Sequence, residues 1–355
     1  MRWFASWFPT WRPTHDGESA VDSLSDHLVQ YNKTYKPFMH PWAVELTIRH
    51  EKAHWVEEEI DLSEDVQDWK SGKMSTLEKA YVTNILRLFT QSDVAVGQNY
   101  YDYYIPLFKN NEIRNMLGSF ACREGTHQRS YALFTDTLCL PDSEYHAFLS
   151  YVEMTDKVEY MQTADLRTTR GVALALVKSV FNEGVSLFSS FAMLLHFQRY
   201  GKMKGMGKVV EWSVRDETMH VEGITHLFHK VCADVPNLTP SDLAAPIQDI
   251  ANQVIALEDR FIDLAYSEIG TMENMTKDDM KQYIRYIADN RLVCLGQPPL
   301  FNIAKNPLPW MEWILNGVDH TNFFENKVTE YDVGSLKGNW LGAYASDDVA
   351  SDVSR

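Results

Sequence analysis

Apolar residues recur at three- and four-residue spacing through most of this chain, and few residues interrupt the pattern. Gly and Pro number only 17 and 13 in 355 residues, and strand-like alternation is hard to find. This spacing is typical of helices that bury one face. It predicts an all-α fold, with helices over residues 41–56, 64–70, 75–105, 112–138, 143–162, 169–199, 205–233, 240–268 and 277–296.

Local start and stop signals support several of these boundaries. Ser75 and Glu78 have the spacing of a capping box. Thr239 precedes Pro240, which predicts a helix that begins at that proline. Gly296 is soon followed by two prolines and is expected to end the last long helix.

The domain organisation follows from composition along the chain. No linker rich in Pro, Gly or Ser divides residues 40–320, so we expect one helical domain over residues 40–324, preceded by an N-terminal extension at 1–39. Residues 325–355 are polar and rich in small side chains. Such a segment buries too little apolar surface to order itself, so it is expected to be a flexible tail for docking a partner.

Composition and charge exclude several classes of protein. With 45% hydrophobic and 23% charged residues, the chain has the make-up of a soluble globular protein. Its net charge of −16 argues against nucleic acid and anionic membranes as main partners. No run approaches the 18 or so apolar residues of a membrane span, and the start is too aromatic for a signal peptide.

The cysteines point to a reducing compartment. Cys122, Cys139, Cys232 and Cys294 form no C-x-x-C pair, and each falls in an apolar stretch. We therefore expect buried free thiols and a cytoplasmic protein.

The most informative motif is Glu-x-x-His, which occurs three times where chance predicts about one occurrence. The pairs are Glu51/His54, Glu124/His127 and Glu217/His220. The last two are distinguished by their position, because Asp93 lies 31 residues before Glu124, and Glu183 lies 34 residues before Glu217. Glu51/His54 has no such upstream acid and is assigned to chance or to pairing on a helix surface.

An acid on one long helix followed by Glu-x-x-His on the next is the ligand pattern of di-iron and di-manganese carboxylate bundles. Residues three apart share a helix face, so each Glu and His can meet one ion. Four carboxylates, about −4 in charge, would balance two divalent cations, whereas alone they would repel and hold protons. Oxygen and imidazole ligands suit Fe or Mn.

Three further residues stand close to this pattern. Tyr131 lies one helical turn after His127, where its phenol could be oxidised; the alternative is an ordinary core tyrosine. Asp216 precedes Glu217 and could bind the far nitrogen of a ligand histidine. Trp55, taken alone, would be a core tryptophan.

A resemblance to a known family covers about residues 40–335. The segments that carry it are His54–Ser63, Gln91–Asp93, Glu124–Tyr131, Glu183–Val185, Arg215–His220, Lys305–Trp310 and Asn322–Glu325. The chain resembles the radical-generating small (beta, R2) subunit of class I ribonucleotide reductase, a member of the ferritin-like superfamily. The resemblance implies a ferritin-like helical bundle with a buried di-metal carboxylate site.

The resemblance also implies roles for these residues. One metal would be held by Asp93, Glu124 and His127, and the other by Glu183, Glu217 and His220. Two ions per chain are implied, with iron favoured and manganese or mixed Mn/Fe as alternatives. Tyr131 matches the tyrosine that carries a stable radical, and Trp55 and Asp216 match the chain that carries an electron and a proton to the metals. Tyr331 matches a tail tyrosine that relays the radical.

The implied partners are a second copy of the chain, in a homodimer, and the large (alpha) catalytic subunit of ribonucleoside-diphosphate reductase. That subunit reduces ribonucleotides to deoxyribonucleotides. The chain departs from many family members at Leu187, where a Phe is common, and at Arg123, where a small or uncharged residue is usual. Two alternatives keep the bundle: a self-contained di-metal oxygenase or hydroxylase, and an iron-storage protein.

Overall fold

The computed structural model describes residues 24–314, except residues 163, 237, 271 and 313. Within these described residues the chain is helical, and the β-type pairing is limited to one isolated bridge between Met272 and Met275. The all-α prediction is therefore confirmed. The predicted tail, with Tyr331, lies outside the described residues, as does most of the predicted N-terminal extension, and the domain boundaries stay predictions.

The main helices are α2 (Pro41–Lys52), α3 (Ser63–Lys70), α4 (Thr76–Asn99), α6 (Asn111–Thr137), α8 (Val152–Gln162), α9 (Thr169–Phe181), α10 (Phe188–Arg199), α11 (Lys204–Asp234), α12 (Ala244–Ile269) and α13 (Lys277–Cys294). Shorter elements are α1 (Asp26–Val29), α5 (Ile105–Leu107), α7 (Glu144–Ala147) and the 3₁₀ turns Glu57–Glu59 and Phe148–Ser150. Two stretches widen into π-helix, and we name them the Tyr100 π segment (Tyr100–Tyr104) and the Glu183 π segment (Asn182–Ser186).

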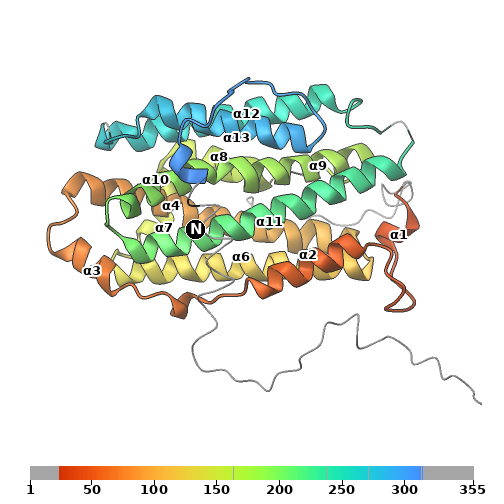
Figure 1. Cartoon of the computed structure of the whole chain (residues 1–355), viewed down its shortest axis with the longest axis horizontal. Coiled ribbons are helices and arrows are strands. Elements are labelled where there is room, and N and C mark those ends of the chain that lie inside the picture. Colours follow the sequence, from red (N-terminus) through yellow and green to blue (C-terminus); the bar gives the residue numbers. More distant parts are fainter. Residues whose placement is uncertain (1–23, 163, 237, 271, 313, 315–355) are drawn as a thin grey trace, which may run out of the picture.

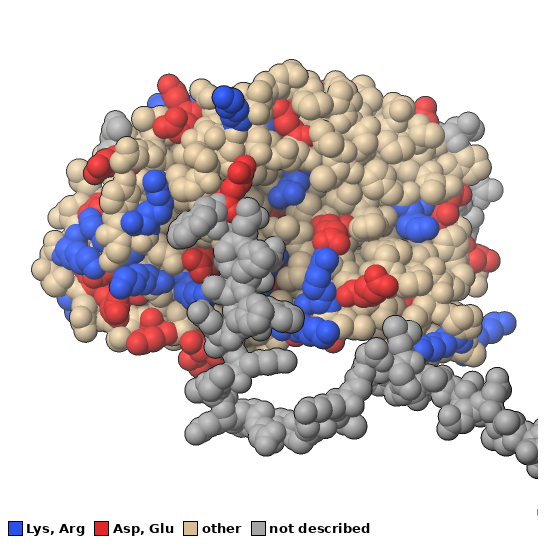
Figure 2. Space-filling view, in the orientation of Figure 1, with Lys and Arg blue, Asp and Glu red and all other residues tan. Residues whose placement is uncertain are grey.

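The long helices run along the long axis of the molecule (Figure 1). The α12–α13 hairpin lies along one side, and α2 and α6 lie along the opposite side. Helix α4 packs on α6, α8 and α12, while α11 packs on α9 and α10. The core is thus a bundle in which α4, α6, α11 and the α9–α10 stretch face one another. On the face drawn in Figure 2, acidic and basic side chains are mixed rather than gathered by sign.

The predicted boundaries agree with the structure except at three places. Helix α2 ends at Lys52 instead of residue 56, because the chain becomes extended by Val56 (φ −131°, ψ 156°). The helix predicted over 143–162 is broken at Tyr151, which is also extended. Helix α12 begins at Ala244, not at Pro240, because Thr239 and Asp242 close a separate turn before it.

The other two boundary signals behave as predicted. The Ser75 hydroxyl accepts from the Glu78 backbone N–H, and the Glu78 carboxylate accepts from the Ser75 N–H, which completes the capping box. Gly296 has φ +77°, a conformation that suits glycine, and α13 ends just before it.

The prediction of four buried thiols is wrong for three of them. All four cysteines are free, but Cys122, Cys139 and Cys294 are exposed and only Cys232 is buried. Apolar neighbours at helical spacing turn inward, and this leaves intervening positions such as Cys122 on the solvent face of the same helix.

The stretch Thr169–Arg199 is long and apolar enough, by length and composition, to cross a membrane. However, 83% of its most apolar 18-residue segment is buried inside the bundle, where the stretch packs on α11 and α12. It is the central helix of the core, and it carries Glu183.

Candidate metal centre

Four neighbouring elements bring the six predicted ligands into one buried cluster. Asp93 comes from α4, Glu124 and His127 from α6, Glu183 from its π segment, and Glu217 and His220 from α11. Each of the six side chains is at most 2% exposed. The long helices that the spacing predicted thus place residues distant in sequence within a few ångströms.

Two glutamates are shared between the two histidines. Glu124 places Oε1 3.0 Å from Nδ1 of His220 and Oε2 3.7 Å from Nδ1 of His127. Glu217 divides its oxygens in the same way, at 3.2 Å from Nδ1 of His127 and 3.5 Å from Nδ1 of His220. This is the arrangement expected of carboxylates that bridge two cations.

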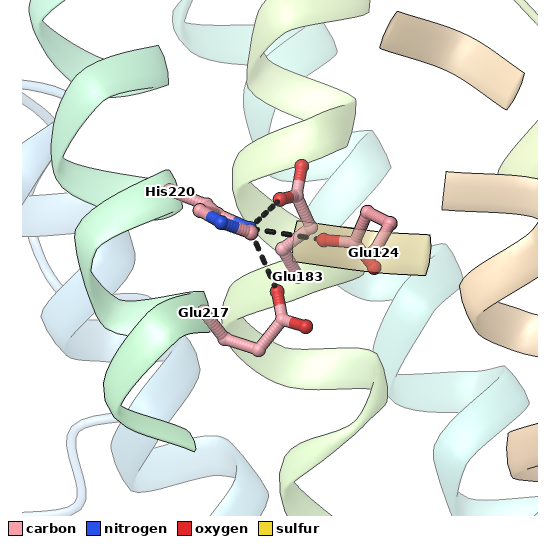
Figure 3. A group of neighbouring side chains, drawn as sticks. All are labelled: Glu124, Glu183, Glu217 and His220. Carbon is pink, nitrogen blue, oxygen red and sulfur yellow. Dashed lines mark ion pairs between the residues drawn. The ribbon is translucent and has the colours of Figure 1, made fainter. Parts of the chain in front are cut away.

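The Glu183–His220 half of the cluster is the tighter one. Figure 3 shows Glu124, Glu183 and Glu217 converging on the His220 ring, and one ligand atom from each of these four residues lies within 4.8 Å of the others. Glu183 contributes Oε2, 3.2 Å from Nδ1 of His220. In the other half, the buried Asp93 carboxylate lies close enough to Glu124 and His127 for their charges to shift its pKa.

The polar atoms of the cluster fit bound cations. Buried N and O atoms almost always have hydrogen-bond partners. Several here have none, namely Asp93 Oδ2, both carboxylate oxygens of Glu124 and of Glu217, and Nδ1 of His127 and His220. All of these atoms offer lone pairs, so a positive ion would satisfy them together. Carboxylate and imidazole donors without thiolate suit iron or manganese.

Charge at the cluster is unbalanced unless protons or cations enter. Burial and the nearby Glu124 raise the pKa of Asp93 well above its usual value, and burial raises the pKa of Glu183 to about 7. Burial alone would lower the pKa of His127 and His220, but close contacts with the surrounding carboxylates raise both pKa values well above the usual 6.5. The histidines therefore hold the protons that cations would displace.

Tyr131 lies beside the Asp93 half. Its ring stacks on Phe89 with centroids 4.7 Å apart, and its hydroxyl donates to Oγ of Ser213 over 3.3 Å. Burial, together with the charge of Asp93, raises the pKa of Tyr131 well above 10. The phenol is therefore neutral, shielded from water and without a direct hydrogen bond to a ligand.

A hydrogen-bonded chain leads away from His127. Oδ2 of Asp216 lies 3.2 Å from Nε2 of His127 and accepts from Nε1 of Trp55 over 2.7 Å. The Trp55 and His127 rings stack with centroids 5.9 Å apart. The three predicted residues thus form one continuous contact path.

Two arginines enclose Asp216. Arg215 donates to Oδ1 of Asp216 over 3.1 Å and to the Ala53 carbonyl over 2.6 Å. Arg123, one of the two departures from the family pattern, lies 3.5 Å from Oδ2 of Asp216 and donates to the Trp55 carbonyl. The hydrogen bond with His127 and these positive charges outweigh burial, which on its own raises the pKa, and hold the pKa of Asp216 far below its usual value.

Sequence reasoning missed two residues whose side chains make polar contacts with the side chains of predicted ligands. Tyr100 donates to Oε2 of Glu183 over 2.6 Å, and Nε2 of His50 lies 3.1 Å from Nε2 of His220. Tyr100 stands seven residues after Asp93, which places both on one helix face, and this spacing could have revealed it. No comparable signal marks His50. Its near neighbours Glu51 and His54 are exposed and away from the cluster, as their assignment to chance predicted.

Two cationic side chains, the buried Lys157 and the half-buried Arg291, donate hydrogen bonds to the Glu183 π segment. Lys157 of α8 donates to the Ser186 carbonyl over 2.9 Å and forms an ion pair with Glu258 of α12. Arg291 of α13 donates to the Gly184 carbonyl over 3.2 Å. A π turn leaves backbone carbonyls without their regular helical partners, and these side chains supply donors.

Comparisons with known proteins agree with this geometry. The family model described as "Ribonucleotide reductase, small chain" matches residues 32–307. The chain is 43% identical to the protein named "Probable ribonucleoside-diphosphate reductase small subunit" of Invertebrate iridescent virus 3, over 86% of each chain. It is 39% identical to the protein of that name in Invertebrate iridescent virus 6, over 88% of this chain and 97% of the other.

Solved structures share the fold. The X-ray structure of Streptococcus sanguinis dimanganese(II)-NrdF superposes with a TM-score of 0.70 at 20% identity, covering 80% of this chain and 99% of the other.

Proposed function

Since this chain belongs to the ribonucleotide reductase small-chain family, we propose that it is the radical-generating beta subunit of a class I ribonucleoside-diphosphate reductase. It stores an oxidising equivalent and passes it to a catalytic subunit, which reduces ribonucleotides to deoxyribonucleotides. The observation that carries this proposal is the pair of buried glutamates that divide their oxygens between two histidines. The fold is the ferritin-like bundle of that family.

Six residues are proposed to hold two metal ions. Asp93 and His127 would hold one ion, Glu183 and His220 would hold the other, and Glu124 and Glu217 would be shared by both; these roles are supported by the shared contacts and the unpaired lone pairs. When bound, the ions supply one-electron oxidation with an oxygen species. Iron is our first choice, and the dimanganese form named for the Streptococcus protein keeps manganese or a mixed centre as alternatives.

Tyr131 is proposed to hold the radical. Its ring is buried and stacked on Phe89, which shields a phenoxyl from water. Loss of an electron from a phenol requires loss of the hydroxyl proton as well. Ser213 Oγ is the hydrogen-bonded neighbour of that hydroxyl, and among the surrounding acids Asp93 has the largest electrostatic effect on the phenol.

Trp55 and Asp216 are proposed to pass an electron and a proton towards His127. Support comes from the unbroken contacts from the indole N–H through the carboxylate to the imidazole. Asp216 also fixes the tautomer of His127: its contact at Nε2 leaves Nδ1 directed at the shared glutamates.

The proposed partners are the large catalytic subunit and a second copy of this chain, in the cytoplasm. Tyr331 is proposed as the relay between the two kinds of subunit. The oxygenase alternative is not favoured, because the viral relatives at 43% and 39% identity both carry the reductase name.

The test is a Tyr131→Phe variant loaded with metal and exposed to oxidant. We expect two ions per chain, unchanged helical content and no tyrosyl signal in low-temperature EPR, because the variant loses one hydroxyl held by a single long hydrogen bond. Tyr283→Phe is the matched control, since Tyr283 is a buried tyrosine on α13 whose hydroxyl makes no hydrogen bond. An unchanged EPR signal in Tyr131→Phe would place the radical on another residue. Loss of the signal with retained turnover would mean that the metal ions store the oxidising equivalent.

A further inference from the structure

A second buried phenol reaches the cluster on the side opposite Tyr131. The Tyr100 hydroxyl donates to Oε2 of Glu183 over 2.6 Å, a short distance typical of a phenol that bonds a charged oxygen. Tyr100 is only 1% exposed, so water does not compete for this contact. Burial, together with the charge of Glu183, raises the pKa of Tyr100 well above 10, so its hydroxyl is a donor at physiological pH.

Two irregular helical stretches create this contact. Tyr100 opens the π segment that follows α4, and Glu183 lies in the π segment between α9 and α10. The first of these segments is anchored to α9, since the Tyr104 hydroxyl contacts Oγ of Ser179 at 2.7 Å and donates to the Ala175 carbonyl. The Tyr100 π segment is therefore held against α9, the helix that leads into the Glu183 π segment.

The Tyr100 ring is fixed by its neighbours. It meets Phe120, Tyr104 and the ligand His220 in edge-to-face contacts, with centroids 6.0, 6.0 and 6.1 Å apart. A ring packed on three sides has few alternative rotamers. Its hydroxyl is thereby directed at one oxygen of Glu183.

The same oxygen also faces the metal-binding side, 3.2 Å from Nδ1 of His220. A carboxylate oxygen has two lone-pair positions. Tyr100 occupies one of them, which leaves the other for a cation and disfavours rotation of the carboxylate. Glu124 and Glu217 have no such donor, and their oxygens are split between the two histidines.

We propose that Tyr100 is a positioning residue that fixes Glu183 as a single-oxygen ligand, through Oε2, to the ion held by His220. This inference rests on the proposed metal centre. It gives that half of the centre a positioning contact of its own, as Asp216 does for His127.

The test is Mn²⁺ binding to the metal-free full-length chain, followed through the EPR signal of free Mn²⁺. Tyr100→Phe should weaken binding of one of the two ions by about 10- to 100-fold, the usual effect of removing a partner of a metal ligand. Tyr283→Phe is the matched control, because it removes a buried hydroxyl on α13 that makes no hydrogen bond. The control should bind both ions like the wild type, and circular dichroism should show equal helical content in all variants.

A double-mutant cycle separates positioning from general destabilisation. In a Glu183→Ala background, Tyr100→Phe should have no further effect on Mn²⁺ affinity, because its only route to the metal is gone. Wild-type affinity in Tyr100→Phe, or an equal loss in both backgrounds, would overturn the inference and leave the metal centre standing. A wild-type chain that binds fewer than two Mn²⁺ ions would instead overturn the metal centre.

Discussion

His127 and His220 stand among carboxylates that favour their protonated forms. Both imidazoles are buried, which by itself opposes a charge, yet nearby carboxylates raise their pKa values, first Asp216 for His127 and Glu124 for His220. Glu183, with a pKa raised to about 7, shares the same surroundings. Protons and metal ions therefore compete for one set of atoms.

This competition predicts a pH-dependent stability of the metal-free chain. Groups whose folded pKa is raised stabilise the fold at low pH, and this stabilisation is lost as pH rises through the folded pKa. For Glu183 the window runs from its usual 4.5 to about 7, and both histidines act in the same direction above 6.5. Below 6.5 the lowered pKa of the buried His50 acts in the opposite direction, so the melting temperature of metal-free protein should fall mainly between about pH 6.5 and pH 8.

Bound cations should remove most of that dependence, because they replace the protons. Thermal unfolding followed by circular dichroism, at several pH values with and without Mn²⁺, measures both forms. If the melting temperature changed with pH in the same way with and without Mn²⁺, the proposed competition between protons and metal ions would be contradicted. The lowered pKa values of Glu124 and Asp216 do not interfere, since their contribution is lost only in stronger acid.

The cluster of the six proposed ligands could be predicted from the sequence because two repeated acid and Glu-x-x-His spacings mark its members. Contacts between elements far apart in the chain could not. His50 contacts His220 across 170 residues, and Arg123 meets Asp216 only because α6 and α11 pack together. Such contacts depend on helix packing, which one sequence does not specify residue by residue.

At the scale of elements, the π segments are what the sequence could not predict. Apolar spacing correctly indicated continuous helices over 75–105 and 169–199. A π turn adds one residue to a helical turn but requires no particular residue type, so the sequence pattern does not reveal it. Both insertions occur at the metal centre. Gly184 fits this local crowding, since a Cβ there would lie 2.7 Å from Nε of Arg291.

The ion pair between Lys157 and Glu258, beside the Glu183 π segment, leads to a prediction about stability. Lys157→Met removes the donor to the Ser186 carbonyl and leaves the Glu258 carboxylate buried without its cation. We expect a loss of about 3–5 kcal/mol in the free energy of unfolding. Chemical denaturation measures it, and Mn²⁺ titration of the same variant should show weaker binding.

A double variant, Lys157→Met with Glu258→Gln, separates the two effects. The neutral amide that replaces the Glu258 carboxylate can still accept from Ser189, so most of the stability should return. The Ser186 carbonyl still lacks its donor, so Mn²⁺ affinity should stay reduced. Recovery of both quantities would mean that the pair stabilises the bundle without positioning Glu183.

At the scale of the molecule, all six proposed ligands lie before residue 221, within the helical bundle. The proposed relay residue Tyr331 lies more than a hundred residues further along the chain. Storage of the oxidising equivalent and its delivery are therefore assigned to separate parts of the protein, and the two can be tested independently.

Deleting residues 326–355 should leave helical content, bound metal and the Tyr131 radical unchanged, because it removes no ligand. It should abolish nucleotide reduction with the large subunit. Tyr331→Phe is the finer variant: it should retain partner affinity, since the ring remains, but stop turnover, since phenylalanine is not oxidised at a comparable potential. Normal turnover by the truncated chain would exclude a tail-mediated relay.

Glu124 and Glu217 each face both histidines, so neither half of the centre has a full set of carboxylates to itself. A cation in one half would use one oxygen of each glutamate, and the other oxygen of each already faces the histidine of the other half. Replacing either shared glutamate should therefore lower metal occupancy at both positions, whereas replacing Glu183 should act mainly on one. A single substitution in the shared pair would thus disable the whole centre and not half of it.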